Sequence, residues 1–272
     1  MKNQIVANYY NNNVYDEWNR LENHWVEFLF TSKVMEKYIK NGDTILDIGG
    51  GPGRYSIYFA KKGCKVTLLD ISEKEIEFAK NKSREENLNI DFVCSDCTDT
   101  YLKYKTFDHI FLMGPLYHLK DDELQKIALL KAIEHLKIGG LIYCSFITNL
   151  AGIIHDLKYG PGCFGKNSKQ DCDLLVDNLL NGEDYKGKSF TECRFMSPKN
   201  ILNFMQQFNL EKVKFFGQES IFAFNELQMK DFPKEEIDNW INAGEKILET
   251  PEVIFSSEFL MYIGMKKSES NE

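Results

Sequence analysis

Four glycines close to residue 50 stand where a chain can wrap around a ligand. They follow Thr44–Ile48, a run of apolar and β-branched residues typical of a buried strand, and helical residues resume at Tyr55. A strand, a glycine-rich loop and a helix start allow the backbone to approach a ligand closely. Asp70 ends the next apolar run, where a carboxylate can accept hydrogen bonds from ribose hydroxyls. The pattern predicts a site for a nucleoside cofactor.

The spacing of the glycines decides between classes of nucleotide site. The dinucleotide fingerprint G-x-G-x-x-G would place its third glycine at Arg54, which argues against NAD and FAD. A phosphate-binding loop would need Gly-Lys-Ser or Gly-Lys-Thr, and none follows the glycines. A glycine-rich turn without a ligand is disfavoured, because so many glycines weaken folding unless something needs the space. What remains is the series Asp47-x-Gly49-x-Gly51-x-Gly53.

Strand and helix patterns alternate along the chain after this loop. Short apolar runs predict strands at 44–48, 65–70, 89–94, 106–113 and 141–147, with residues 138–140 as a turn into the last. Helices are expected at 121–136 and from the capping box of Ser72 and Glu75 to about Glu86. This alternation predicts a mostly parallel sheet, whose ligands bind at the carboxyl ends of the strands. Polar side chains fall at those ends: Asp47, Asp70, Asp96 and His118.

The composition favours a small-molecule site over a nucleic-acid surface. The 272-residue chain has a net charge of −8 and a pI near 5.3, with its basic residues scattered, so no broad phosphate-binding surface is expected. No apolar run is long enough to span a bilayer, and the first residues lack the apolar core of a signal peptide. We expect one cytoplasmic domain without nucleic-acid or membrane partners. Monomer and dimer are left open.

The seven cysteines do not form the even, regular series of a disulfide framework. Cys94-x-x-Cys97 has the spacing of metal ligands, but no second Cys or His pair completes a four-ligand site, so no metal is expected. Three cysteines in a later segment stay as minor candidates for thiol chemistry or soft-metal binding: Cys163, Cys172 and Cys193.

The motifs together resemble those of the class I S-adenosylmethionine (SAM)-dependent methyltransferases. The glycine series, Asp70, Ser95-Asp96-Cys97 and the segment 136–140 occur in that family's order and spacing. The segment Gly114-Pro-Leu-Tyr-His-Leu119 is similar to a motif of one bacterial subgroup. Further similarity to the subgroup, covering almost the whole chain, lies at 16–21, 190–198 and 248–252. The resemblance implies a Rossmann-like, doubly wound α/β sheet, mostly parallel, with an antiparallel last strand and lid insertions.

The resemblance also implies roles for single residues in binding SAM. The backbone of Gly49, Gly51 and Gly53 would pass the methionine part, and Met113 would lie near the sulfonium. Asp70 would hold the ribose hydroxyls and Ile71 would pack on adenine, while Asp96 and the Cys97 amide would bond its polar edge. These roles suit the chemistry of the side chains. Two alternatives stay open: a helix cap for Asp96, and for Asp47 a buried carboxylate that satisfies loop amides without touching a ligand.

The segments around the core have expected roles of their own. Residues 1–43 are expected to form a helical cap, in which Tyr10, Tyr15 and Trp18 either pack on the sheet or close over the cofactor. The SAM-binding core is expected at 44–149. A lid insertion is expected at 150–196, with an ornamental loop as the alternative. Residues 197–272 should complete the sheet around a second insertion at 219–250, whose aromatics either join the core or line an acceptor pocket.

These inferences converge on a SAM-dependent methyltransferase (EC 2.1.1.-) that acts on an N, O or S atom of a small molecule and releases S-adenosylhomocysteine. The methyl of SAM is already activated, so in-line positioning can supply much of the rate. His118, beside Tyr117, is the candidate general base, since an imidazole suits neutral pH. The alternative is that His118 only orients its loop or caps the helix that begins near Asp121. RNA or protein methylation and a non-catalytic SAM-binding regulator remain alternative functions.

Overall fold

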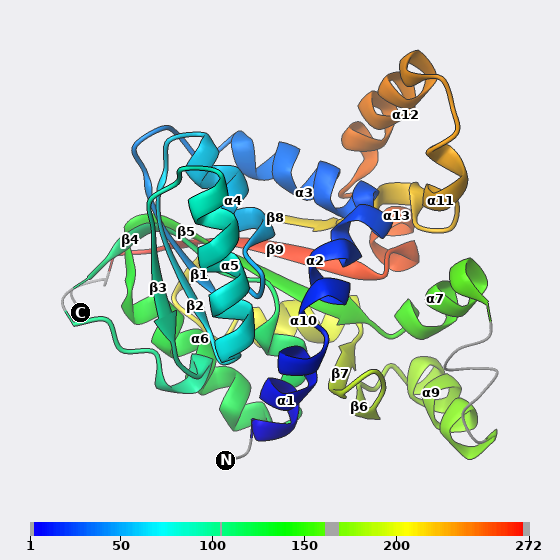
Figure 1. Cartoon of the computed structure of the whole chain (residues 1–272). Helices are drawn as coiled ribbons and strands as arrows, with labels where there is room; N and C mark the ends of the chain where they lie inside the picture. Colours follow the sequence, from blue (N-terminus) through cyan, green and yellow to red (C-terminus); the bar gives the residue numbers. More distant parts are fainter. Residues whose placement is uncertain (1–2, 104, 161–168, 269–272) are drawn as a thin grey trace.

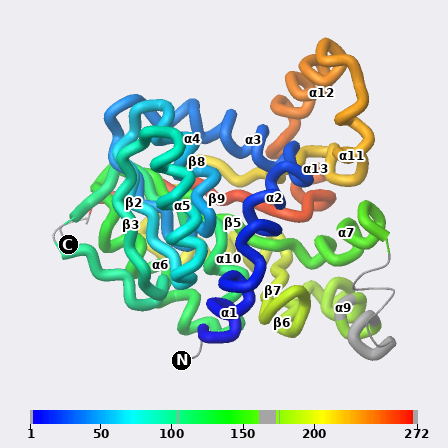
Figure 2. The backbone as a smooth tube through the Cα atoms, in the orientation of Figure 1, coloured from blue at the N-terminus to red at the C-terminus, as the bar shows by residue number. Residues whose placement is uncertain are grey.

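The computed structural model describes residues 3–103, 105–160 and 169–268 (Figures 1 and 2). Within them, nine strands form a single mixed sheet. The strands are β1 (Thr44–Ile48), β2 (Lys65–Asp70), β3 (Ile90–Cys94), β4 (Phe107–Leu112), β5 (Leu136–Thr148), β6 (Tyr185–Lys188), β7 (Glu192–Met196), β8 (Leu210–Gly217) and β9 (Phe259–Lys266).

The central five strands run parallel in the order β3-β2-β1-β4-β5. From β1 the chain crosses to β2 and β3 on one side, and then returns to β4 and β5 on the other. This reversal opens a crevice between the carboxyl ends of β1 and β4. Beyond β5, β9 and β8 continue the sheet antiparallel. The expected Rossmann-like, doubly wound sheet with an antiparallel last strand is confirmed.

Helices cover both faces of the sheet because its strands are apolar on both sides. On one face Ile45 packs in a cluster with α3 (Trp25–Glu36), α4 (Arg54–Lys61) and α5 (Glu73–Glu85). The next residue, Leu46, packs on the other face with α6 (Asp122–Glu134) and α10 (Pro198–Met205). The loops at the carboxyl ends are therefore fixed to a rigid core.

Two local expectations differ from the structure. Residues 138–140 are not a turn before the fifth strand, because β5 already begins at Leu136. Gly139 has a φ of +76°, and the pairing with β4 shifts register between Phe107 and His109, so an irregularity within the strand absorbs these residues. The expected lid segment also contributes to the sheet: β6 and β7 form a hairpin, and β7 pairs with the end of β5 through Ile147 and Thr148.

The N-terminal cap consists of α1 (Gln4–Asn12), α2 (Val14–Asn23) and α3, with breaks at Asn13 and His24. The tube in Figure 2 shows α1 and α2 crossing in front of the sheet. Neither break carries a glycine or proline, and the sequence pattern suggested one continuous helix from Val14.

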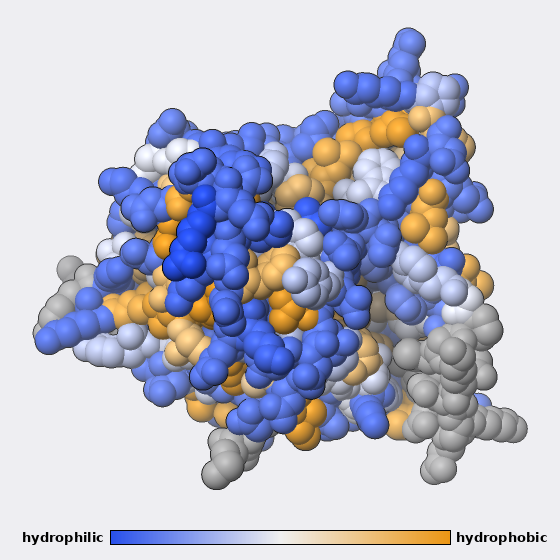
Figure 3. All heavy atoms as spheres, viewed as in Figure 1, coloured by the Kyte–Doolittle hydropathy of each residue, from blue (hydrophilic) through white to orange (hydrophobic). Residues whose placement is uncertain are grey.

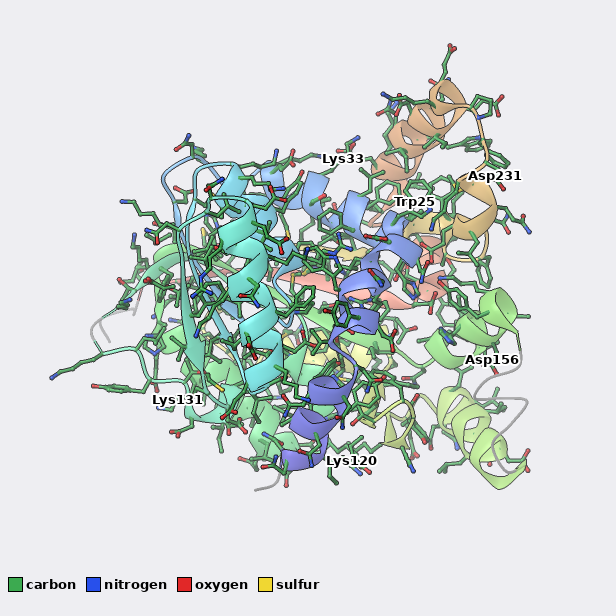
Figure 4. All side chains as sticks on the ribbon, in the orientation of Figure 1. Trp25, Lys33, Lys120, Lys131, Asp156 and Asp231 are labelled. Carbon is green, nitrogen blue, oxygen red and sulfur yellow. The ribbon has the colours of Figure 1, made fainter. Side chains whose placement is uncertain are left out.

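The remaining helices project to one side of the molecule in Figure 1: α7 (Ala151–Tyr159), α9 (Lys169–Asn181), α11 (Glu226–Met229), α12 (Lys234–Ile247) and α13 (Pro251–Ser256). The indole of Trp25 points toward the second insertion and donates to the Glu226 carbonyl at 2.8 Å (Figure 4). Of the aromatics in this insertion, Phe222 is buried, whereas Phe224, Phe232 and Trp240 are 43–50% exposed. Apolar side chains accordingly reach the surface there (Figure 3). No helix in the described ranges is long and apolar enough to span a bilayer.

Candidate cofactor site

A pocket lies in the crevice at the carboxyl ends of β1 and β4, covered by α1 and α2. Its lining comes from the glycine loop, from the ends of β2, β3 and β4, and from the N-terminal cap. It includes the following expected site residues: Asp47, Gly49, Gly51, Asp70, Ile71, Asp96, Cys97, Met113, Tyr117 and His118. Residues distant in sequence thus meet where a parallel sheet of this order places its ligands.

The glycine loop has a backbone that other residues would strain. Gly49 has a φ of +72°, and a Cβ built there would lie 2.5 Å from Cγ of Pro115, so a side chain is excluded by both conformation and space. Gly51 has a φ of +53°, and its nearest neighbour to an added Cβ is Cγ of Glu17 at 3.9 Å. The backbone of Gly51 is therefore open to the pocket. Gly53, which is not among the lining residues, is the N-cap of α4.

Asp47 and Asp70 are both buried, with different partners. Asp47 accepts from the Ser56 hydroxyl at 2.7 Å, so it supports the start of α4 and not the loop amides. Asp70 accepts from the amides of Gly51 and Ser72, one on each oxygen, at 2.8 Å. Burial raises the pKa of Asp47 to about 7 and that of Asp70 to about 6. Each Asp70 oxygen retains acceptor capacity for a hydroxyl.

The capping box at the start of α5 forms only in part. The Ser72 hydroxyl accepts from the Glu75 amide as expected. The reciprocal bond is missing, because the Ser72 amide donates to Asp70 instead. Both carboxyl oxygens of Glu75 are buried without a hydrogen-bond partner, and burial raises the pKa of this group to about 9. In a complete capping box the Ser72 amide would donate to Glu75; here Asp70 accepts that hydrogen bond.

Asp96 has the capping role that was left open as an alternative. Its Oδ1 accepts hydrogen bonds from the amide and the hydroxyl of Thr98. Asp96 thereby caps the start of the short helix η1 (Cys97–Asp99). Its Oδ2 accepts from the side-chain amide of Asn3 at 2.6 Å, so α1 is tied to the rim of the pocket. Although burial opposes it, these bonds lower the pKa of Asp96. Asp96 is ionised, and one of its oxygens faces a primary amide.

His118 lies at the end of η2 (Pro115–His118), the segment after β4. Nδ1 is 3.3 Å from the Glu192 carbonyl, which can only accept, so the proton sits on Nδ1. Nε2 therefore accepts from the Tyr10 hydroxyl at 2.8 Å. Burial lowers the pKa of His118 to about 4. At neutral pH this histidine is uncharged, and its lone pair is engaged by Tyr10. Tyr117 is also buried, and desolvation raises the pKa of its hydroxyl.

Of the cap residues expected either to pack on the sheet or to close over the cofactor, Tyr15, the one assigned to cofactor binding, lies outside the pocket. Tyr15 is 73% exposed, packs edge-on against Phe78 and does not line the pocket. Tyr10 lines it instead, five residues earlier. Trp18 stacks under the Arg54 guanidinium at 3.8 Å and covers the outside of the loop. The break at Asn13 explains the difference, since it changes which face of the cap points inward.

Several lining residues were not singled out from the sequence. Glu17 and Arg20 of α2 and Glu27 of α3 bring three charges into the pocket. Glu17 and Arg20 fall within the segment 16–21 that resembles the bacterial subgroup, which was the available signal. Ser145 and Gln218 also line the pocket and are bonded to each other at 2.5 Å, although they lie 73 positions apart. No local pattern indicated that pair.

No described residue of the expected lid lines the pocket, and its hairpin packs behind residues that do. Phe190, between β6 and β7, packs against the rings of Tyr9 and His118. Among described residues, none from α7 or α9 lines the pocket. Cys193 is buried in the hairpin, while Cys163 lies outside the described residues, as does the side chain of Cys172.

One group in the described chain has the spacing of metal ligands: His24, Glu226 and Glu258. Its centre is filled by the buried Lys158 ammonium, which is 2.5 Å from an oxygen of each glutamate. The two glutamates are therefore ion-paired with this lysine.

The chain matches a known family model over its central part. Residues 45–140 match the model described as a methyltransferase domain, and this range carries the glycine loop, Asp70, Asp96 and η2. The N-terminal cap and everything after Gly140 lie outside the match.

Two curated relatives match over less than half of the chain. A ubiquinone biosynthesis O-methyltransferase of Coxiella burnetii is 35% identical over 118 residues, which are 41% of this chain and 48% of that protein. An (S)-coclaurine N-methyltransferase of Thalictrum flavum is 32% identical over 120 residues, covering 43% of this chain and 32% of that protein. The chain thus spans about half or less of these relatives' length.

Solved structures match over nearly the whole chain. A magnesium protoporphyrin IX methyltransferase from Synechocystis, solved with bound S-adenosylhomocysteine (SAH), has a TM-score of 0.59 at 15% identity, covering 98% of this chain and 100% of that one. A SAM-dependent methyltransferase from Methanosarcina mazei has a TM-score of 0.57 at 17% identity, covering 87% and 98%. Residues 45–140 are thus similar to a methyltransferase domain, and the chain has the Rossmann-like fold of these solved structures.

Proposed function

We propose that this protein binds SAM and transfers its methyl group to an N, O or S atom of a small molecule. The observation that carries the proposal is the convergence of the glycine loop, Asp70, Asp96 and the segment after β4 on one covered pocket. All of these residues lie within the range that matches the methyltransferase model.

The residues present fit the parts of SAM. Asp70 is positioned by two backbone amides and would accept the ribose hydroxyls with its remaining lone pairs. Ile71 would cover one face of adenine, and Asp96 would accept from the adenine amino group at the oxygen that Asn3 now occupies. A primary amide and an exocyclic amine offer the same kind of donor. The open backbone at Gly51 leaves room for the methionine part.

The chemistry that SAM supplies is a methyl group already bonded to a cationic sulfur. The protein then has to orient the acceptor, exclude water and balance charge. Tyr10 and the buried Tyr117 line the pocket beside His118, and these aromatic side chains would exclude water around the end of β4. Positioning in such a site is worth about 7–11 kcal/mol in well-oriented reactions.

Base assistance, where an acceptor needs it, would run through two residues. Tyr10 stands between the pocket and Nε2 of His118. A proton leaving the acceptor would pass to the Tyr10 oxygen while Tyr10 gives its own proton to Nε2. With the pKa of His118 near 4, this is a weak base, so the pair acts mainly by fixing the tyrosine. Acceptors that need no deprotonation suit the site best.

A small acceptor is favoured because the pocket is covered. α1 is bonded to the rim through Asn3, and the Tyr10–His118 bond joins it to η2. The relatives named above act, by their names, on a ubiquinone precursor and on coclaurine. RNA or protein as acceptor, or SAM binding without turnover, would contradict the proposal. We also propose membership of the bacterial subgroup, based on the Gly114–Leu119 segment that forms η2.

Two experiments test the function. Incubation with methyl-labelled SAM and pooled metabolites, read by mass, should give labelled small molecules and SAH. Binding without turnover across the pool, or label on RNA or protein alone, would refute small-molecule transfer. Calorimetry of SAH binding to Asp70→Ala tests the cofactor role: loss of two charge-assisted bonds should weaken binding at least about 10-fold. Unchanged affinity would refute the ribose assignment.

A further inference from the structure

The pocket has a set of uncharged polar side chains beyond Met113, on the side away from the residues expected to hold adenine and ribose. The strand order β3-β2-β1-β4-β5 places those residues on one side of β4 and places β5 on the other. Leu112 of β4 pairs with Cys144 of β5, so the next residue of each strand, Met113 and Ser145, lies at the same level. The uncharged lining residues that we call the neutral group are Ser145, Gln218 and Tyr117.

Hydrogen bonds fix the Gln218 carboxamide in the neutral group. Its oxygen accepts from the Ser145 hydroxyl at 2.5 Å, and its nitrogen donates to the Thr31 hydroxyl at 3.0 Å. These three residues are at most 2% exposed. A carboxamide has two N–H donors, so one remains for the pocket, and the Ser145 oxygen keeps lone pairs. The two side chains therefore present a donor beside an acceptor.

The turn that carries Gln218 is costly for folding. Gln218, Glu219 and Ser220 follow one another and are at most 1% exposed, although polar residues of these types mostly stay at the surface. Ser220 also has a φ of +54°, a conformation that a residue with a Cβ disfavours. Strained backbone of this kind concentrates at functional sites, where the surrounding structure holds it in place. The turn is consistent with a functional role for the Gln218 side chain.

An unpartnered hydroxyl in the neutral group points to a ligand independently. Tyr117 is 9% exposed and lines the pocket. Its hydroxyl lies 3.9 Å from a Cβ built on Gly114, the residue after Met113. Within the described residues this hydroxyl makes no hydrogen bond, although groups buried to this extent normally have a partner. A polar group of a bound molecule would supply one.

The charges around the neutral group disfavour an ionic ligand there. Among described residues, the cationic side chains that line the pocket are Arg20 and Arg54, and both are ion-paired with glutamates of the cap. A ligand carboxylate or phosphate would therefore have no unpaired cation to bind. A ligand ammonium would be repelled by the sulfonium of SAM expected beside Met113. An uncharged polar group suits this end of the pocket best.

We propose that Ser145, Gln218 and Tyr117 recognise the methyl acceptor, and that the acceptor carries an amide edge, in which a carbonyl oxygen lies beside an N–H. The carbonyl would accept from Gln218 and Tyr117, and the N–H would donate to Ser145. The rings of Tyr10 and Tyr117 favour a planar molecule. This role rests on the proposed function, because Met113 marks the expected position of the transferred methyl.

Pyridines that differ in one substituent test the amide edge. Nicotinamide offers a carbonyl and an N–H, methyl nicotinate offers only the carbonyl, and nicotinate carries a charge. In calorimetry on the SAH-saturated protein, we expect nicotinamide to bind about 10-fold more tightly than methyl nicotinate, and nicotinate to bind more weakly than either. Equal affinity for nicotinamide and its ester, tighter binding of nicotinate, or no binding of nicotinamide would overturn the proposal. Tighter binding of 3-hydroxypyridine would overturn it too, in favour of a hydroxyl.

Two variants connect this preference to the neutral group. Gln218→Met keeps the length of the side chain and removes its hydrogen-bonding atoms, so the preference for nicotinamide over the ester should disappear. Because this change leaves Ser145 and Thr31 without a partner, Tyr117→Phe guards against loss of folding: it removes a hydroxyl that bonds no described residue, and should weaken nicotinamide binding several-fold at unchanged stability. Tyr101→Phe makes the same change at a residue that is 69% exposed and outside the pocket, and should alter no affinity.

Titration with SAH separates failure of this role from failure of the proposed function. A wild-type protein that binds SAH but does not discriminate between the pyridines would overturn the role of the neutral group alone. A preference that survives Gln218→Met, together with no effect of Tyr117→Phe, would overturn it as well. A wild-type protein that does not bind SAH would overturn both.

Discussion

Replacing Glu75 by glutamine should stabilise this protein, against the usual effect of substitutions in a core. Glu75 is fully buried on the first turn of α5, and neither carboxyl oxygen has a hydrogen-bond partner. Burial, aided by the negative charges of Asp70 and Glu17, raises its pKa from 4.5 to about 9. At neutral pH the folded protein therefore holds a proton that the unfolded chain releases.

The size of the effect follows from linkage. An acid with a raised pKa weakens folding as pH rises from its unfolded value to its folded value, by about 1.4 kcal/mol per pH unit. At pH 7, about 2.5 pH units above the unfolded value, the cost is about 3 kcal/mol. Glutamine fills the same space without a titrating proton, so Glu75→Gln should recover most of this free energy.

The assay is urea unfolding between pH 4.5 and 8. The difference in unfolding free energy between variant and wild type should be small at pH 4.5 and should grow steadily toward pH 8. Glu77→Gln, an exposed change on the same helix, should show no such trend. A pH-independent difference, or a variant less stable than the wild type at pH 7, would refute the reasoning.

Three further outcomes are expected. Gly49→Ala should lower the free energy of unfolding by about 2–3 kcal/mol in thermal unfolding, because the Cβ of the new alanine meets Pro115. Gly182 has a similar φ of +69° but open space around it, so Gly182→Ala should lower the free energy of unfolding by only about 1 kcal/mol. The free energy of unfolding of the wild type should fall by about 3 kcal/mol relative to that of His118→Gln as pH falls from 6.5 to 4, because the pKa of His118 in the folded protein is lowered to about 4. A difference in urea midpoints that stays constant with pH would contradict this. Lys158→Met should cost about 3–5 kcal/mol, because it strands two buried carboxylates; a smaller loss on chemical unfolding would show that they take up protons readily.

The core of the fold and one half of the site were predictable because their signals are local. The apolar run 44–48, the glycines after it and Asp70 are each read within a few residues, and parallel pairing then brings the strand ends together. The same logic placed Asp96 and His118 at the pocket. The sequence left open whether Asp96 caps a helix; in the structure Asp96 is a helix cap and also accepts a hydrogen bond from Asn3.

The other half of the site depends on tertiary structure. Tyr10 and Tyr15 lie on either side of the helix break at Asn13, and only Tyr10 lines the pocket. The charged lining residues Glu17, Arg20 and Glu27 come from two helices separated by a second break at His24, again without glycine or proline. Gln218, directly after β8, reaches Ser145 of β5 because β9 pairs with both strands, a neighbour relation that no window of sequence contains.

The short pairing between β5 and β7 has a consequence for how this architecture can diversify. Only Ile147 and Thr148 join the hairpin to the central sheet, whereas the strands under the glycine loop are held by longer registers of their own. Insertions, deletions or wholesale exchange of residues 185–196 would therefore remodel the wall around His118 without disturbing the order of β1 to β5. The hairpin can therefore be replaced, in evolution or by protein engineering, while the central sheet stays the same.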